Sequence, residues 1–278
     1  MTAGARKTSP FLSRQLRALD EALAAVIPRV MEAADDEAIH DLRVAIRRVR
    51  TMLKLVRPVY GRFHADSVRR AFTNVQRATG ELRDEEVLEE TLDEARVDFE
   101  SFRGWRSRRR ARERRLRRAV LARLEKGELQ RARAMLRALL TLPVNPNRDR
   151  DLGKFARKCV ERAQRGVEAL RDVSTDDAEG LHELRIAYKE LRYTAELLEG
   201  ALPADLRALA QPAARFQKRL GELHDVDVAT VAARRARALD PEARSALLTR
   251  LAALRDKRVA KYAAEVDPAA SNVRAATP

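Results

Sequence analysis

An internal repeat is the sequence feature that most constrains the fold. The segment Ile39–Arg50 aligns with Leu181–Arg192 at an offset of 142 residues, and Val75–Val87 aligns with Phe216–Val228 at an offset of 141 residues. Two matching blocks in the same order at almost one offset are difficult to obtain by chance. The chain is therefore expected to be a tandem duplication in which each half forms a helical bundle of about four principal helices.

The composition predicts an all-α protein. Ala, Leu, Arg and Glu dominate, Gly and Pro number only 10 each, and alternating β-branched or aromatic residues are scarce, so helix propensity is high almost throughout. Two prolines near the middle of the chain mark the best candidate for a linker. The expected organisation is a first half at 11–142, a linker at 143–149, a second half at 150–265 and flexible ends at 1–10 and 266–278, with the two halves together forming one domain.

The charge balance favours a polyanionic partner. Lys and Arg number 57 against 42 Asp and Glu, which gives a net charge of +15, and a positive surface concentrates anions around itself. Cys159 is the sole cysteine, which excludes an internal disulfide and a structural zinc site built on cysteines. The sequence contains no apolar stretch long enough to cross a membrane. We therefore expect a cytoplasmic protein.

The repeated blocks carry basic residues at helical spacing. At 100° per residue, five basic residues between positions 40 and 54 share one arc of about 80° along about 21 Å of helix axis, opposite an apolar face. The first basic stripe consists of His40, Arg43, Arg47, Arg50 and Lys54, and the second consists of His182, Arg185, Lys189 and Arg192. The first stripe contains no acidic residue, whereas Glu196 stands in the second copy where Lys54 stands in the first. Repeated crowding of like charges indicates an external anion.

The two stripes and the second pair of blocks resemble the CHAD domain family. The resemblance rests on two H-x-x-R-x-x-x-[RK]-x-x-R segments and on two Q-[RK]-x-x-G-E-L-x-D blocks, Gln76–Asp84 and Gln217–Asp225. It implies two pseudo-symmetric four-helix bundles around a basic central cavity that binds inorganic polyphosphate, often at polyphosphate granules. The binding residues that the resemblance implies are those of the two basic stripes.

Further anion contacts are expected outside the stripes. One helical turn before the repeated glycines lie Arg77 and Lys218. The segment Arg103–Arg118 holds ten Arg in sixteen residues. Since these lie all around a helix, the segment is expected to be a cationic surface or to pass through an anion-rich site. Arg109 and Arg110 are the candidate contacts within it.

The repeated glycines are expected to have a structural role. Gly80 and Gly221 are suited to end one helix in a left-handed cap, and Asp84 and Asp225 to cap the next helix. Each block would then form a corner between two helices. Cys159 lies in an apolar periodic pattern and is expected in the core.

Two other classes of protein remain as alternatives. A non-specific nucleic-acid-binding protein shares the need for cationic surface, but the chain has one Trp, four Tyr and seven Phe, and the stripes offer no aromatic platform for stacked bases. A di-metal bundle would use the repeated Glu-x-x-His pairs, Glu37 with His40 and Glu179 with His182. Both pairs run directly into cationic stripes, which would repel a metal ion.

Known catalytic motifs are missing from the sequence. It contains no E-x-E-x-K signature, no G-x-x-x-x-G-K-[ST] loop and no G-x-S-x-G elbow, so phosphoryl transfer and serine hydrolysis lack residues to perform them. We therefore expect a binding protein that is not an enzyme, without cofactor or metal.

Overall fold

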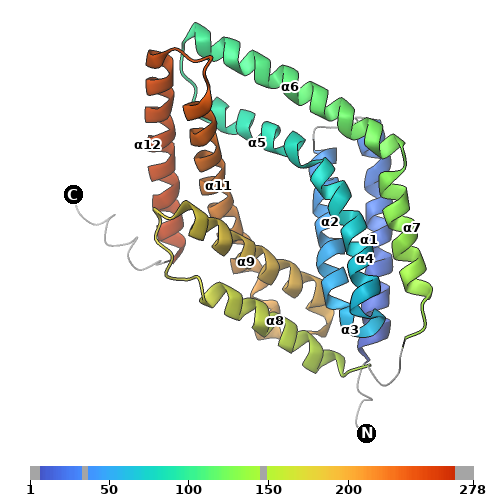
Figure 1. Cartoon of the computed structure of the whole chain (residues 1–278). Helices are drawn as coiled ribbons and strands as arrows, with labels where there is room; N and C mark the ends of the chain where they lie inside the picture. The colour runs from blue at the N-terminus through green and yellow to red at the C-terminus, as the bar shows by residue number, and fades with distance from the viewer. Residues whose placement is uncertain (1–6, 33–36, 145–148, 267–278) are drawn as a thin grey trace. The chain divides into compact units, whose positions relative to one another are not determined.

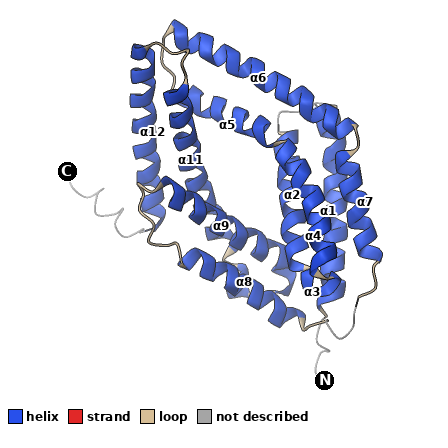
Figure 2. Ribbon diagram, in the orientation of Figure 1, coloured by secondary structure: helices blue, strands red, loops and turns tan. Residues whose placement is uncertain are grey.

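The computed structural model describes residues 7–32, 37–144 and 149–266. Within these ranges the chain is helical and contains no strand beyond one isolated bridge between Lys7 and Asp151 (Figure 2). The all-α prediction is confirmed. The helices are α1 (Thr8–Met31), α2 (Ala38–Leu55), α3 (Arg57–Tyr60), α4 (Arg62–Ala78), α5 (Gly80–Glu94), α6 (Glu100–Glu125), α7 (Glu128–Thr141), α8 (Leu152–Glu168), α9 (Ala178–Leu198), η2 (Glu199–Ala201), α10 (Ala204–Arg207), α11 (Ala210–Arg235) and α12 (Pro241–Val266).

The described residues form two compact units. Unit 1 contains those of Met1–Arg83, Arg114–Ala163 and Glu190–Ala210, and unit 2 those of Asp84–Glu113, Gln164–Lys189 and Gln211–Pro278. Each unit thus takes segments from both sides of the predicted linker. The division of the sequence into two duplicated halves stays a prediction. Most of the linker, at 145–148, and most of the predicted flexible ends, at 1–6 and 267–278, lie outside the described residues, while α1 already begins at Thr8.

Unit 1 is built around α1, α2, α4 and α7. Helix α1 packs on α2, α2 on α4, and α4 on α7 (Figure 1). The apolar face of α2 is buried as its periodicity predicts, and Leu42 and Val49 are fully inaccessible. Asp20 of α1 accepts hydrogen bonds from Arg133 and Arg137 of α7, at 2.6 and 2.8 Å. Apolar packing and this charge cluster, in which Asp20 is buried and Arg137 is exposed, together hold α1 and α7 in place.

Unit 2 has its own apolar core between the helices that it contains. Leu92 of α5, Phe102 and Trp105 of α6, and Val226 of α11 belong to one cluster of buried residues, which α12 completes with Leu251. All five are at least nine-tenths buried. This core fixes the start of α6, so the Arg residues that follow Trp105 are presented on a packed helix.

The prediction of left-handed caps at the repeated glycines is wrong. Gly80 is the first residue of α5, and α11 continues without interruption through Gly221 and Asp225. Among the described residues, the glycines with positive φ are Gly61 and Gly127, at 83° and 78°, where α3 meets α4 and α6 meets α7. A glycine in sequence does not reveal the sign of its φ, and glycine also occurs at ordinary helical angles.

Candidate anion-binding site

The first basic stripe lies on α2 in unit 1, on the side away from the apolar core. His40, Arg43, Arg47 and Arg50 are half-buried and Lys54 is exposed. Helix α2 itself follows from the sequence, because Leu42, Ile46, Val49 and Leu53 recur at helical spacing and are all fully buried. Burying that face directs the opposite face, with its cations, outward. The structure therefore brings the whole first stripe together on one helix.

Two arginines of the first stripe are held by the end of α4. Arg43 donates from Nη1 to the Gln76 carbonyl oxygen at 3.2 Å and to Thr79 Oγ1 at 2.8 Å. Arg50 donates from Nη1 to Gln76 Oε1 at 3.5 Å. Gln76 belongs to the second repeated block, so the two blocks pack against each other in unit 1. Residues of the second block thus orient the guanidinium groups of the first.

Arg50 is crowded by other cations. Burial lowers the pKa of its guanidinium, and the charges of Arg69, Arg47 and Arg77 lower it further. Its Nε is buried without a hydrogen-bond partner, and the structure gives it no ion pair with a carboxylate among the described residues. A half-buried cation with like-charged neighbours and an unused donor is destabilising unless an anion joins it. Arg69 was not anticipated in this cluster.

Tyr193 of α9 adds an aromatic contact to the first stripe. Arg47 donates to the Tyr193 hydroxyl at 3.1 Å. The guanidinium carbons of Arg47 and Arg192 lie 5.9 and 5.4 Å from the Tyr193 ring centroid, a range in which cation–π attraction stabilises a charge. Tyr193 is buried and follows Arg192 directly, outside the helical spacing on which the stripe was defined. Sequence periodicity therefore did not identify it.

Acidic residues partly neutralise one end of this surface. Arg192 donates to Glu196, which stands at the position of Lys54 in the second repeat, at 2.7 Å. Glu196 also lies 3.5 Å from Arg48. Lys54 itself lies 3.6 Å from Glu190. Lys54 and Arg192 are therefore weaker candidates for an external anion than Arg43, Arg47 and Arg50.

His40 lies in the first turns of α2 within a positive environment. Burial lowers its pKa, the charges of Arg83 and Arg47 lower it further, and Glu37 and Asp41 oppose them. The imidazole is thus held in its neutral form more strongly than an exposed histidine. An anion placed beside it would favour the charged form and add a donor.

A second cationic cluster lies within unit 2 and includes a histidine that the stripes did not. His182 of α9 and His224 of α11 stack with ring centroids 4.5 Å apart, and their Nδ1 atoms are 3.3 Å apart. Burial, then the charges of Arg185 and His182, lower the pKa of His224 to about 4. Burial, Arg185 and Lys189 also lower the pKa of His182. His224 occupies the position of Arg83 in the aligned blocks, and this alignment was the signal for it.

Several arginines of the arginine-rich segment form ion pairs with carboxylates. Arg106 binds Glu89 and Asp93 at 2.8 and 2.7 Å. Arg109 lies 2.8 Å from Glu85. Further ion pairs of the segment join Arg103 to Asp98, Arg110 to Glu89 and Arg112 to Glu85. Arg109 and Arg110 were expected to contact an external anion, but in the structure they pair with Glu85 and Glu89 of α5.

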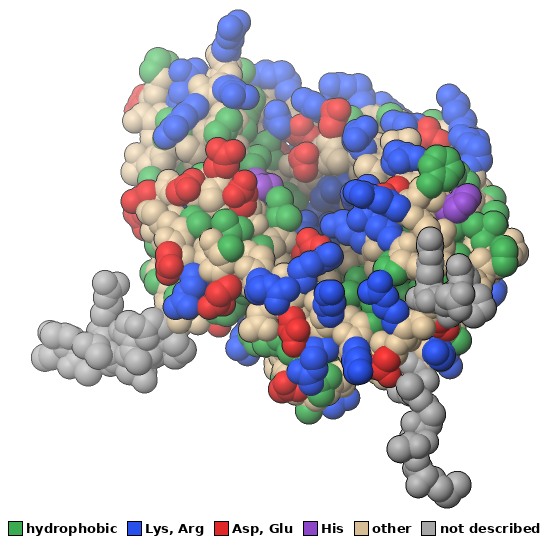
Figure 3. All heavy atoms as spheres, turned by 60° about the horizontal axis from the view of Figure 1, so that its bottom comes forward, with side chains coloured by type: hydrophobic (Ala, Val, Ile, Leu, Met, Phe, Trp, Pro, Cys, Tyr) green, Lys and Arg blue, Asp and Glu red, His purple; other side chains and the backbone are tan. Residues whose placement is uncertain are grey.

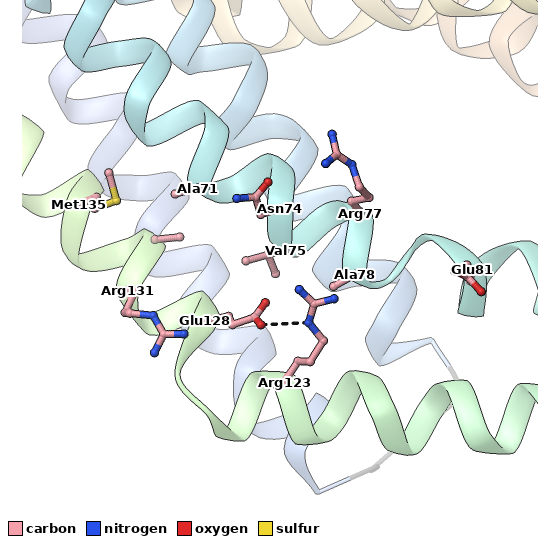
Figure 4. Close-up of a pocket in the computed structure, with 11 residues that line it drawn as sticks. Ala71, Asn74, Val75, Arg77, Ala78, Glu81, Arg123, Glu128, Arg131 and Met135 are labelled. Atoms are coloured by element: carbon pink, nitrogen blue, oxygen red, sulfur yellow. Dashed lines mark hydrogen bonds and ion pairs between the residues drawn. The ribbon is translucent and has the colours of Figure 1, made fainter.

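Arg77 and Lys218 are the other two residues expected to contact an anion, and both are exposed. Arg77 is exposed and lines a cavity of about 650 Å³ with Arg123, Arg131 and two glutamates, of which Glu128 pairs with Arg123 (Figure 4). Lys218 is an exposed residue of α11. Figure 3 shows Lys and Arg side chains gathered into patches on the face that it presents. The charge of Arg77 thus acts on Arg50, and the same residue lines a cavity that contains both arginines and glutamates.

The described residues provide no metal site. None of their His, Cys, Asp and Glu side chains form a group of three or more able to hold a metal ion. Among these residues, the two Glu-x-x-His pairs therefore gain no further ligands that would support the di-metal alternative. No helix in the described part of the chain has the length and apolarity needed to span a membrane.

These features define a class of protein, an all-α protein with half-buried cationic clusters on α2 and around the paired histidines. The family model of the CHAD domain matches residues 14–234, and the chain belongs to that family. The crystal structure of the CHAD domain from the plant Ricinus communis is similar with a TM-score of 0.72 and 22% identity, over 96% of this chain and 94% of that one. PptA from Streptomyces chartreusis is similar with a TM-score of 0.72 and 19% identity, over 94% and 98%. No curated protein matches the chain.

Proposed function

We propose that this protein binds inorganic polyphosphate without catalysis, through the first basic stripe and the histidine cluster of unit 2, at polyphosphate granules in the cytoplasm. The CHAD family is associated with polyphosphate binding in general. Polyphosphate carries about one negative charge per phosphate, and arginine offers it bidentate hydrogen bonds. A flexible chain of phosphates suits cations that follow one helix face.

The observation that carries this proposal is the crowding of Arg50. Its guanidinium is half-buried, faces three like charges and retains a buried Nε without a partner. Arg109 also has a buried Nε without a partner, but Arg109 pairs with Glu85, whereas no ion pair joins Arg50 to a carboxylate among the described residues. The contrast supports α2 rather than α6 as the anion-binding surface.

A competition titration tests the choice of ligand. Long-chain polyphosphate should displace labelled polyphosphate at least tenfold more effectively than duplex DNA of equal charge at about 150 mM salt, since every phosphate polymer shares the electrostatic part of binding. Comparable affinities for the two polymers would contradict the specificity.

A charge reversal on α2 locates the site. Arg47→Glu should weaken polyphosphate binding by about 100-fold or more, because it removes a phosphate contact and adds repulsion. Arg62→Glu is the matched control, since Arg62 lies in the same unit, its side chain is 84% exposed and the change in net charge is equal. If both variants lose the same affinity, net charge rather than the stripe determines binding.

A further inference from the structure

A second cavity of unit 1 lies apart from most of the first basic stripe. It has a volume of about 350 Å³, within the range of small-molecule sites. Helix α8 supplies one wall, with residues at helical spacing that begin at its N-terminus, and the ends of α2 and α3 supply the other. The lining residues are Lys54, Leu55, Pro58, Arg150, Asp151, Lys154, Phe155, Lys158, Cys159 and Arg162.

Cations dominate the charge of this cavity. Five of its ten lining residues are Lys or Arg, and the only acid among them is Asp151. The Asp151 carboxylate already accepts a hydrogen bond from the backbone N–H of Lys154 at 2.8 Å, so it serves as a cap of α8. The N-terminus of α8 adds its own partial positive charge. These groups favour an anion of the phosphate type.

The remaining lining residues form an apolar floor. Leu55 and Phe155 are more than nine-tenths buried, and Pro58 and Cys159 lie beside them. Cys159 is half-buried rather than in the core, contrary to expectation, and burial raises the pKa of its thiol. Inorganic polyphosphate has no apolar group to cover this floor. The cavity therefore matches a molecule with a phosphate at one end and an apolar ring at the other.

We propose that this cavity binds a small organic phosphate with a planar apolar group, of the nucleoside phosphate class. The phosphates lie among Lys154, Lys158 and Arg162, and the ring covers Phe155. Of the first basic stripe only Lys54 reaches the cavity. The cavity therefore shares only Lys54 with the proposed polyphosphate surface, and either proposal stands if the other fails.

The single cysteine of the chain makes the test direct. ADP should protect Cys159 from alkylation by iodoacetamide, with a rate lowered about tenfold at ten times its dissociation constant. Pyrophosphate, which has the same phosphates without the nucleoside, should require a concentration at least about tenfold higher for equal protection, because it leaves the floor uncovered. Equal protection by ADP and pyrophosphate would show a site that recognises phosphate alone, and protection by neither ligand would show that the cavity is not a binding site. Either result overturns the proposal.

Two variants separate this site from the polyphosphate surface. Lys158→Glu should abolish protection by ADP and leave polyphosphate affinity within about threefold, since Lys158 is exposed and outside the first stripe. Lys126→Glu, an equal change of charge at another exposed lysine of unit 1, should retain protection by ADP. A thermal melt by circular dichroism checks that both variants fold. Loss of protection in both variants, or in neither, contradicts the assignment of the cavity.

Discussion

Replacing Arg50 by Met should raise stability and lower affinity for polyphosphate together. The substitution keeps a long apolar stem but removes the charge. In the free protein it removes a buried Nε without a partner and the repulsion from Arg47, Arg69 and Arg77. It sacrifices one weak hydrogen bond to Gln76 at 3.5 Å. A gain in stability together with a loss of binding identifies a residue that serves the ligand rather than the fold.

The expected sizes follow from these groups. An unsatisfied buried donor costs about 1–3 kcal/mol, and the lost hydrogen bond is worth well under about 1 kcal/mol at that length. The net gain in unfolding free energy should be about 1–2 kcal/mol, equivalent to a rise in Tm of about 2–6 °C for a chain of this size. Loss of one charge-assisted contact to phosphate, about 1.5–3 kcal/mol, should weaken binding by about 10–100-fold.

Arg57→Met is the matched control. Arg57 lies in the same unit and donates to Asp66 from Nε and Nη2, at 3.0 and 2.6 Å. Its loss should lower stability and leave polyphosphate affinity unchanged. The assays are thermal and urea unfolding without ligand and calorimetric titration with polyphosphate. If Arg50→Met destabilises the protein as Arg57→Met does, the Arg50 cluster is structural. If Arg50→Met stabilises the protein but leaves the affinity unchanged, the cations around Arg50 do not bind polyphosphate.

Three further predictions concern the acids and histidines. Glu196→Gln should strengthen polyphosphate binding about threefold to tenfold by releasing Arg192, and unchanged affinity in titration would exclude Arg192 as a contact. Polyphosphate affinity should rise up to about tenfold from pH 8 to pH 5.5. Burial and nearby cations lower the pKa of His40 and His182 in the free protein, whereas a bound anion raises it, so binding takes up protons. The variant with both His40→Gln and His182→Gln should show a flatter dependence of affinity on pH. Asp20→Asn should lower the free energy of unfolding in urea by about 3 kcal/mol. Burial raises the pKa of Asp20, but the hydrogen bonds and charges of Arg133 and Arg137 outweigh burial and lower it. The stability that Asp20 contributes should be lost as the pH falls through this lowered pKa, and an unchanged urea midpoint at pH 7 would refute the role of the cluster.

Helical periodicity predicted the parts of the fold that depend on local spacing. It placed the basic and apolar faces of α2 correctly, because burial of Leu42 and Val49 decides the orientation of the whole helix. It could not predict which side chains meet from distant segments. Tyr193 joins Arg47 through tertiary packing, and no spacing within either block encodes that contact.

The arginine-rich segment shows where a sequence signal was present but incomplete. Ten arginines in sixteen residues predict strong positive charge, yet Arg106, Arg109, Arg110 and Arg112 pair with carboxylates of another helix, α5. Glu85, Glu89 and Asp93 recur at intervals of four, which places them on one face of α5. A matching acidic face elsewhere in the chain was thus visible, although the pairing of the two faces depends on the tertiary fold.

The alignment of the repeated blocks has a consequence for how the two clusters respond to anions. In unit 1 the charge of Arg83 acts on His40, and in unit 2 the aligned pair is His224 and His182. The first pair contains a permanent cation, whereas the second contains two groups that lose their charge when buried together. A cluster with a permanent charge attracts an anion at any pH near neutrality. The histidine pair gains charge only as an anion arrives or as the pH falls, so its contribution to binding depends on proton uptake. Unit 2 keeps the permanent charges of Arg185 and Lys189. The substitution of one residue between repeats therefore replaces the constant charge of Arg83 in unit 1 by a contribution in unit 2 that depends on proton uptake.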